Sequence, residues 1–448
     1  MACNFVCVLL LCSVAAGVLA AGGRAFVGLN SNGTNLVLSP PPGGQVVVDG
    51  HVFQELMQRL EQLETRVQDL EDTCPLVADI SIVVPTGGSK WPSGVLADNG
   101  KIYGVPYDSV DSVLIFDPHT GSVDTTTISG LPRGLPKIHN KYLSAVYGNG
   151  KIYGVPYSAT SVLVIDPSTD MADDTVMAGL SGEFKWILGV LANNGKIYGV
   201  PSSASAVLII DPASNTTDVT SIAGVSNGNP RQWAHAVLAS NGKIYCIPWY
   251  AAGVLVIDPS SDTAGTISIA GVQDTTQHQH EKWAFGVLAG NGKIYGLPRD
   301  ANSVLVIDPA TNTADATAII VPGTENKWTS GVLAANGKIY GIPLLASSVL
   351  VIDPTTDTAD YTSIGGLHGD AKWARGILSR SGKIYAAPIN AGTCLVVDPR
   401  TNSVELVSAG AAGVNQFSTA IQASNGRIYA LPAHSDSMLV LKRDCEEL

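Results

Sequence analysis

A tryptophan recurs at one position of a repeated motif, usually directly after a lysine, and this pair is the first candidate for chemistry. The aromatic position is occupied by Trp91, Tyr142, Trp186, Trp233, Trp283, Trp328, Trp373 and Phe417. The preceding lysines are Lys90, Lys141, Lys185, Lys282, Lys327 and Lys372. Aromatic rings stack on the apolar faces of sugars while neighbouring donors bond the hydroxyls, so the pattern is typical of a glycan-binding surface. In the alternative interpretation, each ring is a structural spacer between neighbouring repeats.

Two further sets of polar residues could bind a metal ion. Aspartates recur at a second repeat position: Asp117, Asp166, Asp211, Asp258, Asp308, Asp353 and Asp398. Each is followed by proline, so we expect a turn cap at these positions and not a Ca²⁺ ligand. His278 and His280 form a single His-x-His without further ligands. The sequence contains no nucleophile elbow, phosphate loop or paired acid motif, and we predict no metal, no cofactor and no catalytic residue.

These residues are positioned by a repeat of about 45 residues. In one copy, strands are predicted at 331–334, 338–342, 349–352 and 360–364. Asn336-Gly337 favours a tight hairpin turn because both residues tolerate positive φ, and Asp353-Pro354 ends the third strand. Four short strands in each repeat of this length indicate a β-propeller with one blade per repeat.

The repeat carries a Gly-Lys-Ile-Tyr element, with arginine replacing lysine in the last copy. Its basic residues are Lys101, Lys151, Lys196, Lys243, Lys293, Lys338, Lys383 and Arg427. The last copy lacks a fourth strand, and residues 78–85 are similar to the missing one. We therefore predict an all-β, eight-bladed β-propeller over residues 75–448. The N-terminal strand is expected to complete the last blade and so to remove the open sheet edges.

Gly-Lys-Ile-Tyr followed by Ser-Val-Leu-Val-Ile-Asp-Pro-x-Thr resembles kelch-type and YVTN-type β-propeller repeats. The YVTN likeness is clearest at residues 304–313, whereas the kelch diglycine is replaced here by sequences such as Gly-Val-Pro. The resemblance extends over about residues 75–445 and implies the propeller fold. Both groups include binding, scaffolding and enzymatic proteins, so no single function follows from it.

The segments before the repeats differ in composition. Residues 1–20 are predicted to be a signal peptide, and residues 21–50 a Gly/Pro-rich stalk or a small β-hairpin formed by 35–38 and 45–48. Residues 51–74 favour a coiled-coil neck that joins several chains, because apolar residues alternate at spacings of three and four. The alternative is a single amphipathic helix packed on the propeller. The seam consists of Phe53, Leu56, Leu60, Leu63, Val67, Leu70 and Cys74.

Four cysteines remain after removal of the signal peptide. Cys74 and Cys445 flank the two strands that are expected to pair, which favours a disulfide within the chain; in the alternative, Cys74 links two chains at the neck. Cys246 and Cys394 are predicted to be buried thiols. The sequons at Asn32 and Asn215 are candidate glycosylation sites.

Composition and charge restrict the classes of function that this sequence can have. The formal net charge is −12, and no basic run alternates with aromatic residues, so nucleic acid is excluded as a partner. No membrane span is expected once the signal is removed. The interpretation favoured is a secreted or cell-surface binding module that recognises glycan or protein ligands and is displayed as a coiled-coil oligomer. The alternatives are a structural building block of a coat, matrix or flagellar-hair-like assembly, and a secreted enzyme that uses the central channel.

Overall fold

The structure is a computed structural model. It describes residues 26–29, 36–39, 62, 75–131, 138–226, 231–272, 281–323, 325–410 and 413–443. The chain divides into two compact units, of which one contains residues 78–423 and 427–441 and the other 1–77, 424–426 and 442–448. The predicted signal peptide, the neck (apart from Gln62), the Cys74–Cys445 disulfide, the sequon at Asn32 and the His-x-His pair lie outside the described residues.

A short hairpin is described in the first unit. Strand β1 (Phe26–Leu29) pairs antiparallel with β2 (Leu36–Ser39), and Val27 lies opposite Leu38. The sequence was compatible with either a stalk or a hairpin in this region, and the hairpin it predicted paired residues 35–38 with 45–48. The run at 35–38 does form a strand but pairs with residues 26–29, while 45–48 lie outside the described residues.

The second unit is built from sets of four strands, which in all sets but the last are antiparallel and hydrogen-bonded in chain order. The first sets are β4 (Gly94–Leu96), β5 (Ile102–Gly104), β6 (Leu114–Asp117) and β7 (Ser122–Asp124); β8 (Tyr142–Gly148), β9 (Lys151–Pro156), β10 (Leu163–Asp166) and β11 (Met171–Asp173); and β12 (Trp186–Leu191), β13 (Ile197–Pro201), β14 (Leu208–Asp211) and β15 (Thr216–Asp218). The next are β16 (Trp233–Leu238), β17 (Ile244–Pro248), β18 (Gly253–Asp258) and β19 (Thr263–Ala270); and β20 (Trp283–Leu288), β21 (Ile294–Pro298), β22 (Ser303–Asp308) and β23 (Thr313–Ile320). The last are β24 (Trp328–Leu333), β25 (Ile339–Pro343), β26 (Leu350–Asp353) and β27 (Thr358–Asp360); β28 (Trp373–Leu378), β29 (Ile384–Pro388), β30 (Thr393–Asp398) and β31 (Ser403–Ser408); and β32 (Phe417–Gln422), β33 (Ile428–Pro432) and β34 (Ser437–Arg443) with β3 (Leu76–Val83).

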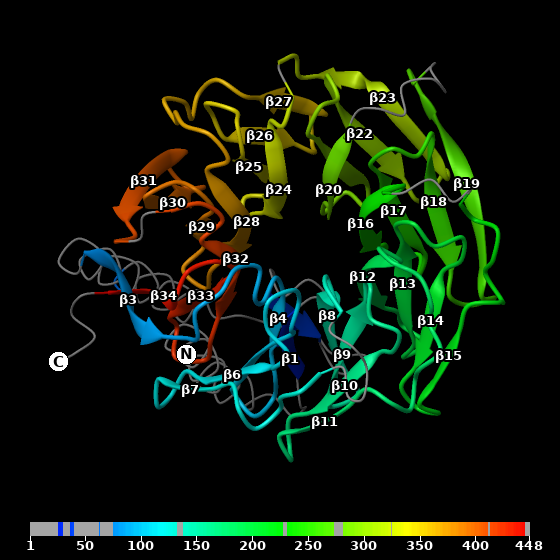
Figure 1. The fold of residues 1–448 in the computed structure, drawn as a ribbon. Coiled ribbons are helices and arrows are strands. Elements are labelled where there is room, and N and C mark those ends of the chain that lie inside the picture. Colours follow the sequence, from blue (N-terminus) through cyan, green and yellow to red (C-terminus); the bar gives the residue numbers. More distant parts are fainter. Residues whose placement is uncertain are drawn as a thin grey trace, which may run out of the picture. The chain divides into compact units, whose positions relative to one another are not determined.

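The sets form a closed ring. Figure 1 shows the first strand of each set around the centre and the last strand at the periphery. Each first strand contacts the first strand of the next set, and β32 contacts β4, which brings the two ends of the array together. In addition, β19 and β23 form a short parallel pair at the periphery, with Ile269 opposite Ala314. The fold is a β-propeller, as the repeat pattern predicted.

The ring is closed by the N-terminal strand. The described strands of the last set follow the order β3-β34-β33-β32, so β3 is the outer strand that the last repeat lacks. The amide of Val84 donates to the carbonyl of Asp436 at 2.9 Å just beyond this pairing. The strand predicted at residues 78–85 is therefore found in the predicted place, although it begins at Leu76 and ends at Val83.

The outer strand of the sixth repeat is misplaced in the sequence prediction. It was expected at residues 360–364, but β27 ends at Asp360. The Asp360 carboxylate accepts the amides of Thr362, at 2.8 Å, and Ser363, at 3.1 Å. This side chain offers the backbone an alternative partner to a neighbouring strand, so the chain turns where the pattern suggested extension.

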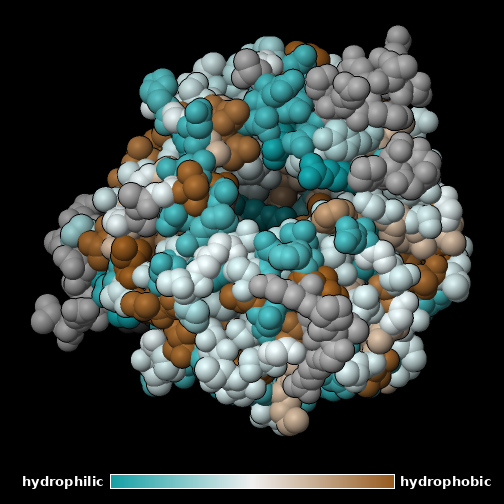
Figure 2. Space-filling model, viewed as in Figure 1, coloured by the Kyte–Doolittle hydropathy of each residue, from teal (hydrophilic) through white to brown (hydrophobic). Residues whose placement is uncertain are grey.

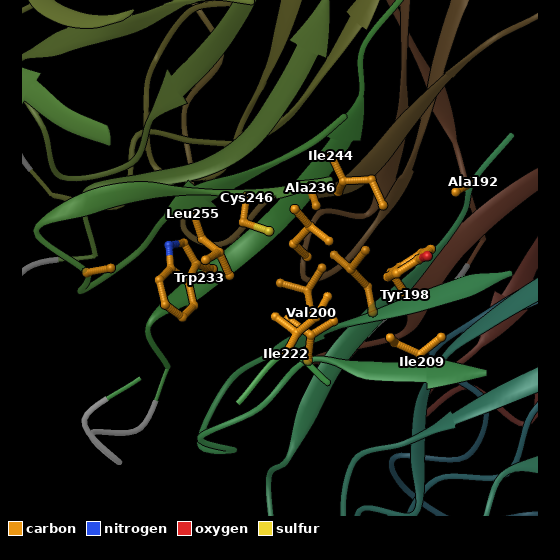
Figure 3. Packing of buried hydrophobic residues seen from close by; sticks show 14 residues of the cluster. Ala192, Tyr198, Val200, Ile209, Ile222, Trp233, Ala236, Ile244, Cys246 and Leu255 are labelled. Atoms are coloured by element: carbon orange, nitrogen blue, oxygen red, sulfur yellow. The ribbon is translucent and has the colours of Figure 1, made fainter. Parts of the chain in front are cut away.

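The hydrophobic core lies between neighbouring blades (Figure 3). In one cluster, Tyr198 and Val200 of β13 pack with Trp233, Cys246 and Leu255 of the next blade, and all are at most 3% exposed. The free thiols of Cys246 and Cys394 are both buried, as predicted. Each blade therefore stabilises its neighbour, because neither face of a blade can be buried without the blades on both sides.

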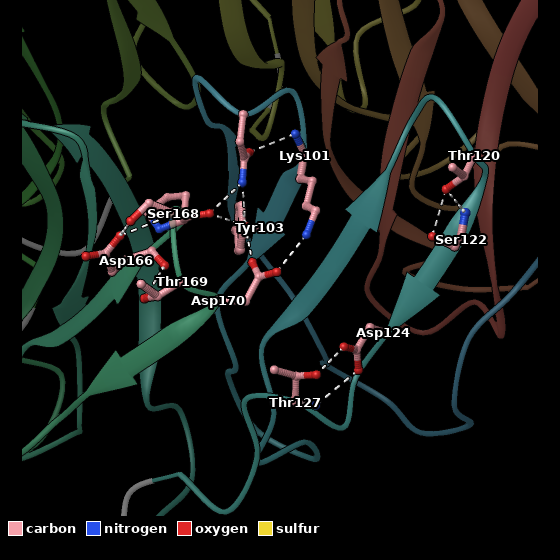
Figure 4. Close-up of polar contacts among 12 residues, drawn as sticks. Lys101, Tyr103, Thr120, Ser122, Asp124, Thr127, Asp166, Ser168, Thr169 and Asp170 are labelled. Carbon is pink, nitrogen blue, oxygen red and sulfur yellow. Dashed lines mark hydrogen bonds and ion pairs between the residues drawn. The ribbon is translucent and has the colours of Figure 1, made fainter.

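In several copies, the Gly-Lys-Ile-Tyr element joins a blade to the next one. The Asn291 amide donates to the Tyr295 hydroxyl, at 2.9 Å, and to the carbonyl of Pro354 in the next blade, at 2.8 Å. The Tyr295 hydroxyl and the Lys293 ammonium both bond the Asp357 carboxylate, at 2.5 Å and 2.7 Å. Figure 4 shows the same arrangement, with Lys101 and Tyr103 of one blade against Asp170 of the next. We call this set of contacts the interblade clamp.

The turn aspartates cap turns, as the sequence predicted. The carboxylates of Asp166, Asp258 and Asp353 accept the backbone amides two residues later at 3.0 Å. Hydrogen bonds to these carboxylates stabilise their charged form. In the described residues, no group of three or more His, Cys, Asp or Glu side chains is placed to hold a metal ion.

The turn aspartates, together with Asp360 at the end of β27, also predict the response to acid. Hydrogen bonds from Ser363 and Thr362 lower the pKa of Asp360 to about 2, and bonds to Ser168 lower the pKa of Asp166. Since the unfolded chain binds protons at higher pH than the folded chain, these groups contribute stability that is present above about pH 4 and lost as the pH falls toward about 2. We expect the melting temperature to fall steadily over this interval in a thermal scan. A melting temperature that stayed constant there would contradict the capping role.

Candidate functional site

The aromatic rings of the Lys-Trp pairs are buried. The six tryptophans are at most 3% exposed, and Tyr142 and Phe417 are at most 2% exposed. Each indole N–H donates to a backbone carbonyl further along the same blade, for example Trp283 to Ser303 at 2.8 Å and Trp328 to Ser348 at 2.9 Å. Stacking on a sugar requires an accessible ring face. The burial therefore favours the structural alternative, in which the rings pack between blades.

The lysines of these pairs hold loops together. Lys185 Nζ donates to the carbonyls of Gly182 and Ala159 at 2.7 Å and 2.8 Å, and burial lowers the pKa of Lys185 to about 8. Lys372 Nζ bonds the carbonyls of Leu344 and Gly369 in the same manner. Lys90, Lys185, Lys327 and Lys372 are at most 3% exposed, and Lys282 is half-buried. We letter the four strands of a blade a to d from the centre outward, so that the d–a loop joins consecutive blades and the b–c loop follows the proline of strand b. The ammonium groups of Lys185 and Lys372 bond the backbone of both kinds of loop.

A β-bulge follows the aromatic residue in the innermost strands. The register of the first two strands shifts between Trp233 and His235, between Trp283 and Phe285, and between Trp373 and Gly376. Similar shifts occur in β8, β12, β24 and β32. A bulge changes the direction of the side chains that follow it. The residues placed two after the aromatic ring are Ser93, Ser144, Leu188, His235, Phe285, Ser330, Arg375 and Thr419.

Two of the serines in this set bond the backbone of the next blade near the centre of the ring. The Ser330 hydroxyl accepts the amide of Gly376 at 3.1 Å, and the Ser93 hydroxyl accepts the amide of Ala145 at 3.3 Å. Each of these bonds joins the innermost strand of one blade to that of the next. The bulge therefore both lines the centre and connects the blades there.

A pocket of about 350 Å³ lies where the bulges meet the b–c loops. The inner strands contribute Thr329, Arg375 and Ser418, and the loops after the b-strand prolines contribute Tyr107 and His434. Figure 2 shows a hollow at the centre of the ring with hydrophilic side chains on its wall. The Thr329 hydroxyl is buried without a hydrogen-bond partner. The pocket thus contains donors that are already positioned for a polar ligand.

Three side chains from different blades form a stack within this central region. The rings of His235 and Phe285 lie with their centroids 3.7 Å apart and are inclined by 28°. The Arg375 guanidinium carbon lies 5.7 Å from the centroid of Phe285. Burial, together with the charge of Arg375, lowers the pKa of His235 to about 3, so that its imidazole is neutral at neutral pH. We call these three residues the channel stack.

A second polar cluster lies in the loops of the fourth and fifth blades. Arg299 Nε forms an ion pair with Glu281 at 2.7 Å, and the Arg299 guanidinium carbon lies 4.8 Å from the ring centroid of Trp249. Arg231 approaches Glu281 at 3.8 Å. The charge of Arg231 also acts on Tyr157, the residue after the second b-strand proline. Arg231 and Arg299 thus place positive charge in the same kinds of loop that line the pocket.

The sequence interpretation chose the constant positions of the repeat, and it missed Arg375, Phe285, His235 and Trp249. A signal for them was present. The aromatic position and the Gly-Val-Leu-Ala run are nearly constant, whereas the residue two after the aromatic ring is Ser, Leu, His, Phe, Arg or Thr. The residue after the b-strand proline also varies, from Tyr107 through Trp249 to Ala433. Variation between otherwise matching copies marks the positions that architecture does not determine.

Comparison with known proteins supports the fold. No protein-family model and no curated protein matches the sequence. The chain is similar in structure to the Dos1 propeller, with a TM-score of 0.56 and 9% identity over 80% of this chain and 95% of that one. It is also similar to a catalytically inactive virginiamycin B lyase from Staphylococcus aureus with quinupristin, with a TM-score of 0.51 and 9% identity over 82% and 99% of the two chains. A streptogramin B lyase gives a TM-score of 0.50 and 12% identity over 67% and 92%.

At these identities the likeness concerns the fold alone.

In the described part of the chain, no helix has the length and apolar character needed to cross a bilayer.

Proposed function

We propose that this protein is a secreted or cell-surface binding module, an eight-bladed propeller that binds a polar ligand of the glycan class at the mouth of its central channel. The observation that supports this most is the convergence of the variable repeat positions. The bulge residues and the b–c loop residues differ between copies, and one pocket is lined by Arg375 from the first group and by Tyr107 and Ile389 from the second. Because the architecture does not determine the residues at these positions, they can be adapted to a ligand.

The lining of the pocket combines apolar surface with a few polar groups, a combination that suits a sugar. Tyr107 offers a half-buried ring, while Ser89, Asn415 and His434 offer donors and acceptors. Sugars are bound by this combination of an aromatic face and convergent hydrogen-bonding groups. The site proposed here therefore replaces the buried tryptophans with the loop and bulge residues that face the hollow.

Display on a cell surface or in oligomers forms the second part of the proposal. Residues 1–20 serve as a signal peptide, residues 51–74 join chains, and Cys74 pairs with Cys445. The described sequon at Asn215 is exposed on a turn, which is compatible with glycosylation there. Several propellers on one neck would bind a multivalent surface more tightly than one. Mass measurement of the intact protein and of a form lacking residues 51–74 tests the neck; a monomer in both would contradict it.

Glycan-array binding followed by titration tests the site. We expect Tyr107→Ala and His434→Ala to weaken binding at least about tenfold, because each removes a pocket contact whose loss costs on the order of 1.4 kcal/mol. The matched control is Met171→Ala, which changes a side chain that is 66% exposed on the outer strand β11. Binding that is unchanged in both pocket variants would place the site elsewhere. A wild-type protein that binds no glycan would exclude the ligand class.

A further inference from the structure

We propose that the ligand of this propeller carries a carboxylate, and that Arg375 binds that carboxylate in the central channel. The inference rests on the proposed function and specifies the chemical class of its ligand. It would make the protein a receptor for acidic saccharides, such as those that contain uronic acid residues.

The position of Arg375 is the first observation. The residue lies in the bulge of β28, yet its guanidinium lies over Phe285 of β20, which belongs to the blade two places earlier in the ring. The side chain therefore extends across the inner wall of the channel, past β24. Attraction between the guanidinium and the ring face favours this position of the side chain. The planar guanidinium can bind a carboxylate through two parallel hydrogen bonds.

The lack of a counter-charge is the second observation. Arg299 pairs with Glu281 at 2.7 Å, and Arg400 pairs with Asp398 at 2.9 Å. By contrast, within the described ranges no carboxylate forms an ion pair with Arg375. The formal net charge of the chain is −12, so acidic partners are abundant elsewhere. An arginine without an acidic partner on the wall of a pocket is available to bind an anionic group.

The Arg375 side chain is accessible from the hollow. It is exposed, and it lines the pocket of about 350 Å³. A ligand in the pocket can therefore reach the guanidinium, where opposite charges attract each other.

His235 supports the stack without competing for the anion. Its Nδ1 lies 3.4 Å from the amide of Gly286, which donates to it. This contact places the remaining proton of the neutral ring on Nε2. The imidazole then supports Phe285 from one side, while Arg375 covers the ring from β28. The channel stack therefore orients a single cation toward the pocket.

Calorimetric titration with paired probes tests the proposal. The probes are glucuronate, its uncharged methyl ester, glucose and acetate, all at one ionic strength so that screening is constant. We expect wild-type protein to bind glucuronate at least about tenfold more tightly than the ester, as a charge-assisted bidentate contact requires. We expect Arg375→Gln to abolish this preference and Arg375→Lys to retain only part of it. Arg400→Gln, which removes the same charge from an exposed outer turn, should leave the preference unchanged.

The outcomes separate this inference from the proposed function. Equal affinity for glucuronate and its ester in the wild type, or a preference that survives Arg375→Gln, overturns the carboxylate site. If neutral sugars still bind and lose affinity in Tyr107→Ala, the proposed function stands without it. Acetate that binds as tightly as glucuronate and depends on Arg375 supports the anion site but assigns it to small carboxylic acids and not to sugars. No binding of any probe to wild-type protein rejects both proposals.

Discussion

Replacing Trp283 by alanine is expected to lower the free energy of unfolding by about 3–5 kcal/mol, the usual cost of deleting a large ring from a packed core. The indole is 1% exposed and packs among Tyr245 and Ile294 of two neighbouring blades. Its N–H also donates to the carbonyl of Ser303 at 2.8 Å, and the substitution would leave that carbonyl without this donor. Chemical denaturation of the purified variant measures the loss.

The matched control for this change is Trp283→Phe. Phenylalanine occurs naturally at the same repeat position as Phe417, which is 2% exposed, so the ring fits there. We expect this variant to lose about 1–2 kcal/mol, from the missing hydrogen bond and the smaller volume. If Trp283→Ala unfolded at the same denaturant concentration as wild type while glycan binding disappeared, the indole would be a ligand-binding residue and its structural role would be wrong.

Replacing Gly331 by valine is expected to cost about 1–3 kcal/mol or more through overpacking. A Cβ atom at this position would lie 2.7 Å from one methyl carbon of Leu297 and 3.0 Å from a methyl carbon of Val287. Both neighbours belong to the preceding blade, and both are buried. Because this position lies where consecutive innermost strands meet, any side chain larger than a methyl group forces two blades apart.

Gly290→Val is the matched control for Gly331→Val. Gly290 is exposed, and a Cβ atom there would meet nothing within 4 Å. We expect the stability of this variant to stay within about 0.5 kcal/mol of wild type, as is usual for surface substitutions. Thermal unfolding of the two variants side by side measures the difference. Equal melting temperatures would show that the blades adjust to the added volume.

Much of the fold could be predicted from the sequence because its determinants are local. The Asn336-Gly337 turn and the strand after it are specified within a few residues, and the structure places β25 at Ile339–Pro343. Closure was predictable for a different reason, since the last repeat lacks one strand and β3 supplies it. The outer strands were less predictable. Where an aspartate such as Asp360 captures the following amides, the strand ends after three residues.

The candidate site could not be predicted in the same manner. Arg375 and Phe285 are distant in sequence and meet only because a ring brings β28 and β20 to one centre. Their direction depends on bulges, which the hydrophobic pattern of the strands does not reveal. Conversely, the tryptophans drew attention because of their chemistry, but burial of their rings was decided by packing between blades. The constant positions of the repeat indicated the residues that form each blade. The variable positions lie near the centre of the ring, where the blades meet.

The interblade clamp has a consequence for how such a chain can change its size. Its donors, such as Asn291 and Lys293, lie on one side of a repeat, and its acceptors, such as Pro354 and Asp357, lie on the side of the next. The contact resembles the head-to-tail interface of a cyclic oligomer, but here it joins repeats of a single polypeptide. A duplicated repeat would carry both halves of the contact and would fit between any two neighbours. Gene duplication could therefore have lengthened the array one unit at a time, until the rotation between neighbours brought the first strand back to the last.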